Sequence, residues 1–484
     1  MSASLFRMRL KSMEIFRRGL ILLLFFSALP LFASQVHIRG EAPDYVNTQV
    51  LFYATEDGLS QLQRVIHVAE SDAQGRFEAT FPWDETGEID IYIRHIRGTM
   101  IVQPNRRYEV FFPPLHKEQV RSFGGNTHVD LVFLNLPDND PNALISQLHV
   151  AVDSFLVANV ALVGSRAFKP KFESFETSMQ QRFNHVDAYT ATELHYILAS
   201  TAFQTQVYTR RDLFDKYLKS SSFEPHPMFF AFLGSFFQKY FARFGANHGP
   251  DLIPKALASR DPGPALLELI QKDEFLERDV LREMVAVQAL IEAYYLQADG
   301  RNVLRVLEHL GENASTEYLQ KASHNVITAL TRASKGFPAP ELKFYDQHNE
   351  QVSLEDFRGK YVYLEFFATW CSDCPKDQSL LPALIAEYSE VVEVVSVVVD
   401  SPREAFQRHL SKYPQLKWPV LFDDTGFESR DRFGLRALPA YFLIDPEGNF
   451  YRSPAKSPSA GIAEDLYPIL QRAKESRRIG VGSK

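Results

Sequence analysis

The chain has 484 residues, of which 45% are hydrophobic and 23% charged, a balance that is typical of folded globular domains. Its 52 basic and 60 acidic side chains give a formal net charge of −8. No broad basic excess is present to neutralise phosphates, so no nucleic-acid partner is expected. A chain of this length is expected to form two to four domains.

Residues 1–33 have the pattern of a signal peptide. Basic residues precede an apolar run, GLILLLFFSALPLFA, and Ala33 offers a cleavage point. The apolar run is shorter than the roughly 20 residues of a spanning helix, but an uncleaved membrane anchor stays open as the alternative. Met13 is a second possible start. We therefore expect an extracytoplasmic protein, with the periplasm as the favoured location.

Residues 35–137 are predicted to form an all-β accessory domain. Short runs rich in β-branched and aromatic residues alternate with turn residues such as Asp57-Gly58. The runs cover 36–42, 49–55, 63–70, 75–83, 88–96, 108–114 and 128–136. About seven strands at short spacing indicate a β-sandwich.

Residues 138–334 are predicted to form a helical region. The segment Asp138 to Pro141 supplies a capping acid and then a proline for the first turn. Helices are expected at 141–163, 171–185, 190–219, 226–244, 262–275, 278–298, 302–310 and 315–334. A dense aromatic run from Phe229 to Phe241 favours core packing, with a protein-binding groove as the alternative.

Residues 337–478 form the third predicted unit, after a linker rich in proline and glycine. A hairpin is expected first. Strands follow at 361–368, 391–400, 419–424, 440–445 and 450–452, and helices at 375–389, 402–412, 427–433 and 461–475. Strands that alternate with helices predict an α/β fold with a largely parallel sheet covered on both faces.

Both cysteines of the chain, Cys371 and Cys374, lie in this third unit. A β-rich run delivers them to the first turn of a predicted helix, where unpaired N–H groups and partial positive charge stabilise a thiolate. Two cysteines in so long an exported chain form no disulfide framework, so both belong to one site. A four-ligand zinc site would need a second pair, so no metal is expected.

The pair and its flanks resemble the thioredoxin superfamily, specifically the exported TlpA/ResA-like thiol-disulfide oxidoreductases. The matching segments are FPAPELKFYD, SLEDFRGKYVYLEFFATWCSDCP, VVSVVVD and LPAYFLIDPEG. The resemblance covers residues 337–478, under a third of the chain. It implies a thioredoxin-like fold, an oxidoreductase activity, and a redox-active disulfide between Cys371 and Cys374 with no other cofactor.

The resemblance also implies roles by matched position. Cys371 would be the attacking thiolate and Cys374 the buried resolving thiol. Leu438-Pro439 matches the family's cis-proline loop, whose backbone pairs with the substrate chain, and an ordinary trans proline is the alternative. Glu365 matches a buried acid that takes the proton of Cys374, and a salt bridge to a lysine is the alternative.

Three further residues are candidates for the site. Trp370 is expected to be an exposed aromatic side chain that contacts substrate. Asp377 stands where ResA-like proteins carry a functional glutamate, although an acid is common in a first helical turn. Asp373 puts negative charge between the sulfurs and opposes thiolate formation, which predicts a reductant or general exchanger rather than a strong oxidase.

The predicted function is an extracytoplasmic enzyme that reduces or exchanges disulfides of exported proteins and is recharged by a membrane electron donor. Two alternatives stay open. One is a binding or scaffold protein in which residues 35–334 do the main work. The other is a thiol peroxidase, although its P-x-x-x-T-x-x-C pattern is missing, since Thr369 stands two residues before Cys371.

Overall fold

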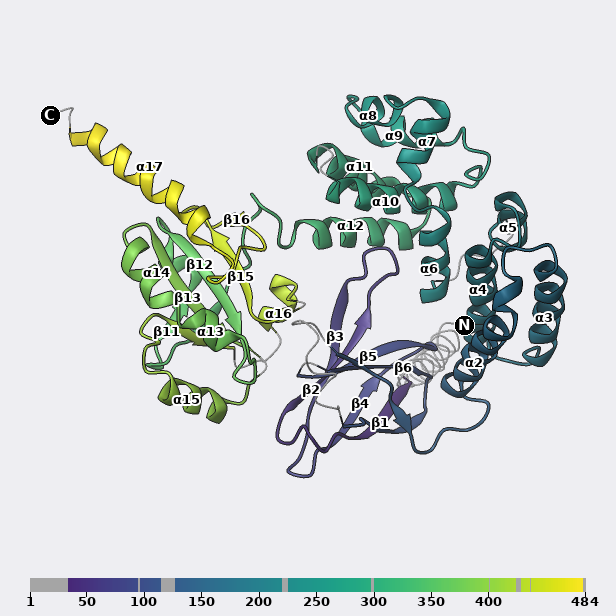
Figure 1. Cartoon of the computed structure of the whole chain (residues 1–484), viewed down its shortest axis with the longest axis horizontal. Helices are drawn as coiled ribbons and strands as arrows, with labels where there is room; N and C mark the ends of the chain where they lie inside the picture. Colours follow the sequence, from purple (N-terminus) through teal and green to yellow (C-terminus); the bar gives the residue numbers. More distant parts are fainter. Residues whose placement is uncertain are drawn as a thin grey trace, which may run out of the picture.

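The computed structural model describes residues 34–94, 96–114, 127–219, 225–296, 300–399, 401–423, 428–435 and 437–481. The predicted signal peptide, residues 1–33, lies outside the described residues. Three regions follow one another along the chain (Figure 1). A β region, in purple, lies below a helical region in blue and teal, and an α/β domain in green and yellow stands beside both.

The described part of the β region contains nine strands in two sheets. One sheet has the order β4-β1-β7-β9 and the other β3-β2-β5-β6-β8. The strands are β1 (Gln35–Glu41), β2 (Gln49–Thr55), β3 (Gln63–Glu70), β4 (Arg76–Pro82), β5 (Gly87–Ile93), β6 (Ile96–Val102), β7 (Arg107–Phe111), β8 (Thr127–Val129) and β9 (Val132–Phe133). Alternating apolar residues from both sheets, such as Ile38 and Phe52, belong to one hydrophobic core.

The strand pattern differs from the sequence prediction at two places. The predicted run 88–96 is followed by β6, which the sequence does not announce. Arg94, in the connection between β5 and β6, has a left-handed φ of 53° without a turn residue such as glycine or asparagine. The predicted run 128–136 is divided between β8 and β9, which belong to different sheets.

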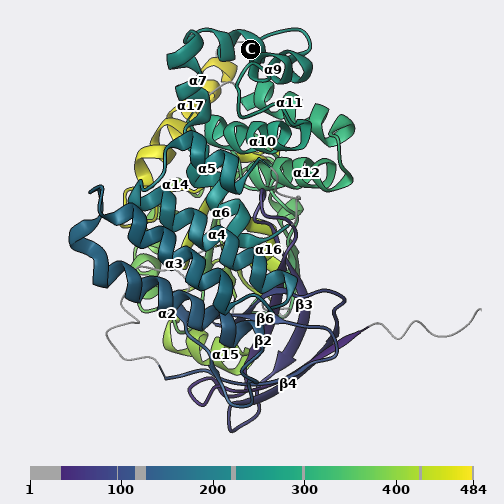
Figure 2. The same ribbon diagram turned by 90° about the vertical axis from the view of Figure 1, so that its right-hand side faces the viewer.

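The helical region packs around a large apolar core. Its elements are α2 (Pro141–Asn159), η2 (Val160–Leu162), α3 (Phe168–Arg182), α4 (Ala188–Thr205), α5 (Arg210–Tyr217), α6 (Pro227–Phe236), α7 (Tyr240–His248), α8 (Leu252–Leu257), α9 (Pro262–Ile270), α10 (Asp279–Tyr295), α11 (Gly300–Asn313) and α12 (Glu317–Thr331). Figure 2 shows α2, α3, α4 and α5 stacked in front of the other regions.

Two of the predicted helices are each divided in two. The prediction 190–219 breaks at Gln206, which has a φ of 54°, and 226–244 breaks before Lys239, which has a φ of 53°. Gln206 ends α4 in the left-handed conformation, where glycine is the usual signal, and Lys239 is the residue before α7. Helix α8 lies where no helix is predicted.

The aromatic run of the helical region is part of its core. Phe232 and Phe236 are completely buried, and Phe229 is 4% exposed. Their rings pack at an angle to one another, with centroids 5.9 Å apart for Phe232 and Phe236. The core-packing prediction is therefore confirmed, and the run is not an open groove.

One helical segment of the described chain, Pro141–Leu162, is long and apolar enough to cross a membrane by length and composition. Its residues are mostly outside the core, with Val157 76% exposed and Val160 70% exposed. A single helix that passes this test is weak evidence for a membrane span.

The C-terminal α/β domain has a seven-stranded sheet of order β11-β10-β14-β13-β12-β15-β16. Its elements are β10 (Lys343–Tyr345), β11 (Gln351–Ser353), η3 (Leu354–Phe357), β12 (Tyr361–Phe367), α13 (Cys374–Gln378), α14 (Leu381–Tyr388), β13 (Val392–Val398), α15 (Arg403–Lys412), β14 (Val420–Phe422), α16 (Glu428–Phe433), β15 (Ala440–Ile444), β16 (Phe450–Arg452) and α17 (Ala463–Val481). Strand β12 lies inside the sheet, and every residue after Tyr361 in it is buried.

The prediction of a largely parallel sheet is wrong. Parallel pairing is confined to β12 with β13 and β13 with β14. Strands β10 and β15 run antiparallel to β14 and β12. The outer pairs β10–β11 and β15–β16 are hairpins with short connections, and a short connection allows antiparallel pairing only.

Hydrogen bonds join the β region to the helical region. The tip between β2 and β3 extends to α12 (Figure 1). There the Gly58 N–H donates to the Tyr318 hydroxyl at 3.0 Å, and the Asn325 amide donates to Asp57 at 2.8 Å. Helix α12 in turn leads directly into the α/β domain, so this contact fixes the β region next to the linker.

Candidate active site

The two cysteines follow the end of β12, a largely buried strand of the α/β domain. Apolar residues hold β12 between β13 and β15, and the chain then turns through Ala368 to Cys371. Cys374 begins α13, and Pro375 occupies the first helical turn, where its missing N–H costs no hydrogen bond. Cys371 and Cys374 form a disulfide.

The two sulfurs differ in access. Cys371 is 9% exposed, whereas Cys374 is completely buried. The backbone N–H of Cys374 donates to Cys371 Sγ at 3.2 Å. A helix N–H pointed at sulfur stabilises negative charge there. The geometry therefore favours Cys371 as the sulfur that a client reaches first.

The turn before the cysteines is anchored by a serine from the next strand connection. Ser401 Oγ accepts hydrogen bonds from the Thr369 N–H at 3.0 Å and from the Thr369 hydroxyl at 3.1 Å, and donates to the Val399 carbonyl at 3.0 Å. Thr369 is two residues before Cys371, so these hydrogen bonds hold the turn that leads from β12 to Cys371 in place.

Leu438 and Pro439 lie at the same edge of the sheet as the cysteines. Their peptide bond is cis, as the resemblance implies. Ala440, the next residue, pairs with Phe366 of β12, so Pro439 stands beside the strand end that carries Cys371. Residues about 70 positions apart in the chain are thus brought to one edge.

Glu365 is completely buried within β12. Its Oε2 accepts hydrogen bonds from the Ser396 hydroxyl at 2.5 Å and the Gln378 amide at 3.3 Å, and its Oε1 lies 3.4 Å from the Tyr441 hydroxyl. Burial raises the pKa of this carboxyl to about 7, with a smaller contribution from Asp377, while the hydrogen bonds oppose the rise. Within the described part of the chain no lysine pairs with it, so the salt-bridge alternative is wrong.

Asp377 lies on α13 and is 6% exposed. Its Oδ2 accepts from the Tyr441 hydroxyl at 3.1 Å, and its Oδ1 accepts from the backbone N–H of Ser459 at 3.2 Å. Ser459 is an exposed residue. Asp377 therefore stands between the buried acid and the protein surface.

Trp370 is less exposed than the sequence predicts, and Asp373 has a cationic partner. Trp370 is half-buried and packs against the domain core, so it is less open than predicted. Asp373 is exposed and accepts from Lys376 Nζ at 2.8 Å. That cation offsets part of the negative charge that the sequence places between the sulfurs.

Several polar residues of the site escape the sequence prediction. Ser396 pairs with Glu365 across β13 and β12, and its hydroxyl also accepts from Trp418 Nε1 at 2.8 Å. Gln378 contacts Glu365 through its amide nitrogen, and its Oε1 lies 3.4 Å from His409 Nε2. Tyr441 follows Pro439 by two residues. A signal existed for Ser396, because it is the one polar residue within the apolar stretch 394–399.

The described residues contain no group of three or more histidine, cysteine or acidic side chains placed to hold a metal ion. The site consists of a disulfide, two carboxyl groups and hydroxyl and amide donors. Such a set can move protons and exchange disulfides without a bound group.

Comparison with known proteins places this domain. The AhpC/TSA family profile matches residues 336–452. The thiol-disulfide oxidoreductase ResA of Bacillus thuringiensis subsp. konkukian is 35% identical over 114 residues, which cover 23% of this chain and 65% of that protein. ResA of Geobacillus thermodenitrificans is 30% identical over 125 residues, which cover 26% of this chain and 71% of that protein.

One solved structure is also similar to part of this chain. The thioredoxin domain of a thiol-disulfide oxidoreductase from Bacteroides vulgatus is 25% identical, with a TM-score of 0.25, and the match covers 29% of this chain and 96% of that domain. The family profile covers most of the α/β domain, including its Cys-x-x-Cys pair. Through that domain the chain belongs to the thioredoxin-like AhpC/TSA family, together with the ResA proteins.

Proposed function

We propose that this protein is an extracytoplasmic thiol-disulfide oxidoreductase that reduces or exchanges disulfides of exported proteins. One observation supports this most directly. Cys371 is the more accessible cysteine, at 9% exposed, while Cys374 and the acid Glu365 are both completely buried. That arrangement suits an attacking sulfur, a resolving sulfur and a base for the resolving thiol.

The reaction begins with the reduced dithiol. The Cys371 thiolate attacks one sulfur of a client disulfide, and the other client sulfur leaves as a thiolate. Glu365 then takes the proton of Cys374, and the Cys374 thiolate attacks Cys371 Sγ. The second client sulfur leaves, two electrons have passed to the client, and the Cys371–Cys374 disulfide of this structure has formed. Leu438, Pro439 and Trp370 would contact the client chain.

The direction of electron flow in this proposal is reductive or exchanging. Asp373 places a carboxylate between the two cysteines in the sequence and disfavours the thiolate that a strong oxidant needs, although Lys376 offsets part of that charge. A recharging reductant is then required. We assign it to a membrane electron donor, with no cofactor beyond the Cys371–Cys374 pair and a signal peptide at residues 1–33 for export.

The residues before the redox domain would choose the client. We assign 35–137 to a β-sandwich accessory domain, because two sheets share one core, and 138–334 to a helical region, with the redox domain at 337–478. A cavity of about 430 Å³ lies where the β region faces the redox domain. Gln49 and Arg94 line it on one side and Ser401 and Arg403 on the other. Ser401 also accepts a hydrogen bond from Thr369, so this cavity borders the turn that carries Cys371.

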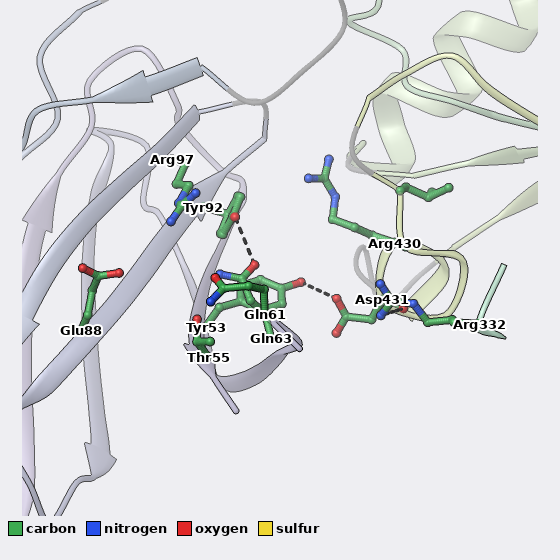
Figure 3. Close-up of a pocket in the computed structure, with 12 residues that line it drawn as sticks. Tyr53, Thr55, Gln61, Gln63, Glu88, Tyr92, Arg97, Arg332, Arg430 and Asp431 are labelled. Atoms are coloured by element: carbon green, nitrogen blue, oxygen red, sulfur yellow. Dashed lines mark hydrogen bonds between the residues drawn. The ribbon is translucent and has the colours of Figure 1, made fainter. Parts of the chain in front are cut away.

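A second cavity, of about 420 Å³, lies along the same strand β2 (Figure 3). Tyr92 and Arg97 line it from the β region, and Arg430 and Asp431 from the redox domain. Figure 3 shows the Tyr53 hydroxyl reaching across to Asp431, to which it donates at 2.9 Å. A client segment bound in the first cavity would lie next to the turn that carries Cys371.

Trapping tests the activity directly. Cys374→Ala leaves Cys371 as the only thiol of the chain, so every disulfide-linked client must be joined there. We expect extracytoplasmic proteins to be captured, and none by the matched control Cys371→Ser/Cys374→Ala. Captured proteins that are not reduced by the wild-type chain would contradict the proposal. Client binding that survives in the control variant would support the scaffold alternative, and hydrogen peroxide consumption the peroxidase.

A variant of the first cavity tests the role of the β region. Arg94→Ala/Arg403→Ala should raise KM for a protein disulfide about fivefold and leave the rate with a small aromatic disulfide unchanged. Lys255→Ala, on an exposed side chain far along the helical region, is the matched control. Equal KM values in both variants would remove the β region from client choice.

A further inference from the structure

One tyrosine hydroxyl lies between the two carboxyl groups of the redox domain. Tyr441 projects from β15, and its oxygen is 3.4 Å from Glu365 Oε1 of β12 and 3.1 Å from Asp377 Oδ2 of α13. All three side chains are buried, with exposed fractions of 4%, 0% and 6%. Water therefore has little access to the space between them.

The number of protons in this group is limited. A tyrosine hydroxyl has one proton and can donate to one carboxyl at a time. Its lone pairs would face the second carboxyl, and two acceptors in contact inside a protein are unfavourable. The contacts are all satisfied when one carboxyl is protonated and donates to the Tyr441 oxygen, while the Tyr441 hydroxyl donates to the other.

The neighbours of Glu365 decide which of its oxygens holds the proton. Trp418 Nε1 donates to Ser396 Oγ at 2.8 Å, so the Ser396 proton is directed to Glu365 Oε2. The Gln378 amide donates to the same oxygen. With Oε2 accepting two hydrogen bonds, the proton of a neutral Glu365 belongs on Oε1, which faces Tyr441.

The neighbours of Asp377 direct it to the opposite state. Its Oδ1 accepts from the Ser459 N–H, and its Oδ2 faces the Tyr441 hydroxyl. Both oxygens are acceptors, which is the pattern of an ionised carboxylate. A directed chain of hydrogen bonds therefore runs from Glu365 Oε1 through the Tyr441 oxygen to Asp377 Oδ2.

We propose that Tyr441 is a positioning residue that relays the proton of Glu365 to Asp377, and so connects the buried acid of the redox site to the surface. The proposal rests on the proposed function. After Glu365 has taken the Cys374 proton, its Oε1–H bond breaks as a new O–H bond forms on Tyr441. The original Tyr441 O–H bond breaks as one forms on Asp377 Oδ2. No electrons change hands in this step, and the reverse step returns the proton on reduction.

The surroundings allow Tyr441 to relay without becoming ionised. Burial, with Glu365 and Asp377 adding to it, holds the pKa of Tyr441 far above its ordinary value. From β12, Tyr363 stacks on it with ring centroids 5.4 Å apart, and burial raises the pKa of Tyr363 as well. From α15, His409 faces Gln378 rather than the carboxyl groups, and burial lowers its pKa. Among the described residues, the two carboxyl groups are therefore the ones that exchange the proton.

Tyr441→Phe is the informative variant, since it removes the hydroxyl and keeps the ring. Tyr363→Phe is its matched control, because the Tyr363 hydroxyl donates to the Lys456 carbonyl at 2.7 Å and touches neither carboxyl. Infrared spectroscopy of the oxidised protein follows the carbonyl band of a protonated acid, which Glu365→Gln identifies. We expect a wild-type midpoint near pH 7, since the pKa of Glu365 is about 7. Tyr441→Phe should raise the midpoint of Glu365 by about one pH unit. The ionised Glu365 carboxylate loses the hydrogen bond that the Tyr441 hydroxyl can donate to it, and its charged form is therefore less stable.

Asp377→Asn separates a relay from simple electrostatics. Loss of the neighbouring negative charge should lower the Glu365 midpoint, which is the opposite of the Tyr441→Phe result. In single-turnover release of a client, both variants should nevertheless be about tenfold slower than wild type, since each breaks the same chain. The double variant should be no slower than either single one.

The relay is overturned if Tyr441→Phe and Tyr363→Phe share the wild-type midpoint, or if the rate losses of Tyr441→Phe and Asp377→Asn multiply. The infrared midpoint requires no client and no turnover. It therefore tests the relay even for a wild-type chain that reduces no protein, whereas that inactivity would end the proposed function instead.

Discussion

Two buried glutamates, one in the helical region and one in the redox domain, have different partners. Glu176 of α3 is 4% exposed, and it accepts hydrogen bonds from the Lys216 ammonium group and the Tyr217 hydroxyl. Glu365 is 0% exposed and receives hydroxyl and amide donors alone. A cation compensates the first charge, so that glutamate fastens α3 to α5. Among the described residues no cation pairs with Glu365, and its pKa of about 7 lets its proton move near neutral pH.

The largest expected effect comes from the loss of the attacking sulfur, that of Cys371. Cys371→Ser should reduce client-disulfide reduction by roughly a thousandfold or more, because no thiolate remains to attack. Glu176→Gln should keep the wild-type rate, measured with the same client. Residual turnover in Cys371→Ser above the rate without protein would show that the chemistry lies elsewhere.

The pH dependence of stability should reveal the raised pKa of Glu365. The Glu365 pKa of about 7 lies above its ordinary value of 4.5, so the folded state holds this proton while the unfolded state has released it. The stability from this group is complete below about pH 4.5 and is lost as the pH rises through 7. Relative to Glu365→Gln, the oxidised wild type should lose about 3 kcal/mol of unfolding free energy over that window. Urea unfolding at pH 5 and pH 8 measures it, and a constant difference would contradict it.

Glu365→Gln should also affect the rate. The amide cannot take the Cys374 proton, so resolution of the mixed disulfide should slow by about a hundredfold. The first attack by Cys371 should be unchanged, because Glu365 has no part in it. Rapid mixing with a chromogenic disulfide resolves the two steps. A loss confined to the first step would place Glu365 in thiolate formation.

The smallest expected effect lies at the contact between regions. Tyr53→Phe removes the hydrogen bond to Asp431 and should cost about 1 kcal/mol of unfolding free energy. The redox rates with a small disulfide should stay at the wild-type level. Tyr345→Phe, on a 44% exposed side chain, is the control and should leave the unfolding free energy unchanged.

Sequence reasoning located the redox pair because its signal is local. A β-rich run, two cysteines and a helical run lie within one short segment, and the structure joins Cys371 to Cys374 as expected. Glu365 was found for a related reason, since a lone acid in an apolar strand needs an explanation. The C-terminal thioredoxin-like fold follows from the same segment and its flanks.

The parts that the sequence did not reveal depend on contacts between distant residues. Tyr441 belongs to an ordinary strand run, and only the pairing of β15 with β12 brings its hydroxyl to Glu365. The left-handed residues Gln206 and Lys239 divide helices without glycine, so tertiary packing rather than local preference sets those breaks. The direction of β10 and β15 in the sheet depends likewise on pairing with β14 and β12, which the sequence does not show.

Six consecutive residues of β2 and its hairpin, 53–58, connect all three regions. Tyr53 bonds to Asp431 of the redox domain, and Gly58 to Tyr318 of α12. Arg332, just after α12, closes the path by donating to the Asp431 carbonyl at 2.9 Å. Each of the three regions therefore contacts the other two, which holds them in one arrangement. Under the proposed function, we expect the cavity next to the turn that carries Cys371 to admit a disulfide on a thin, extended loop rather than one inside a folded domain.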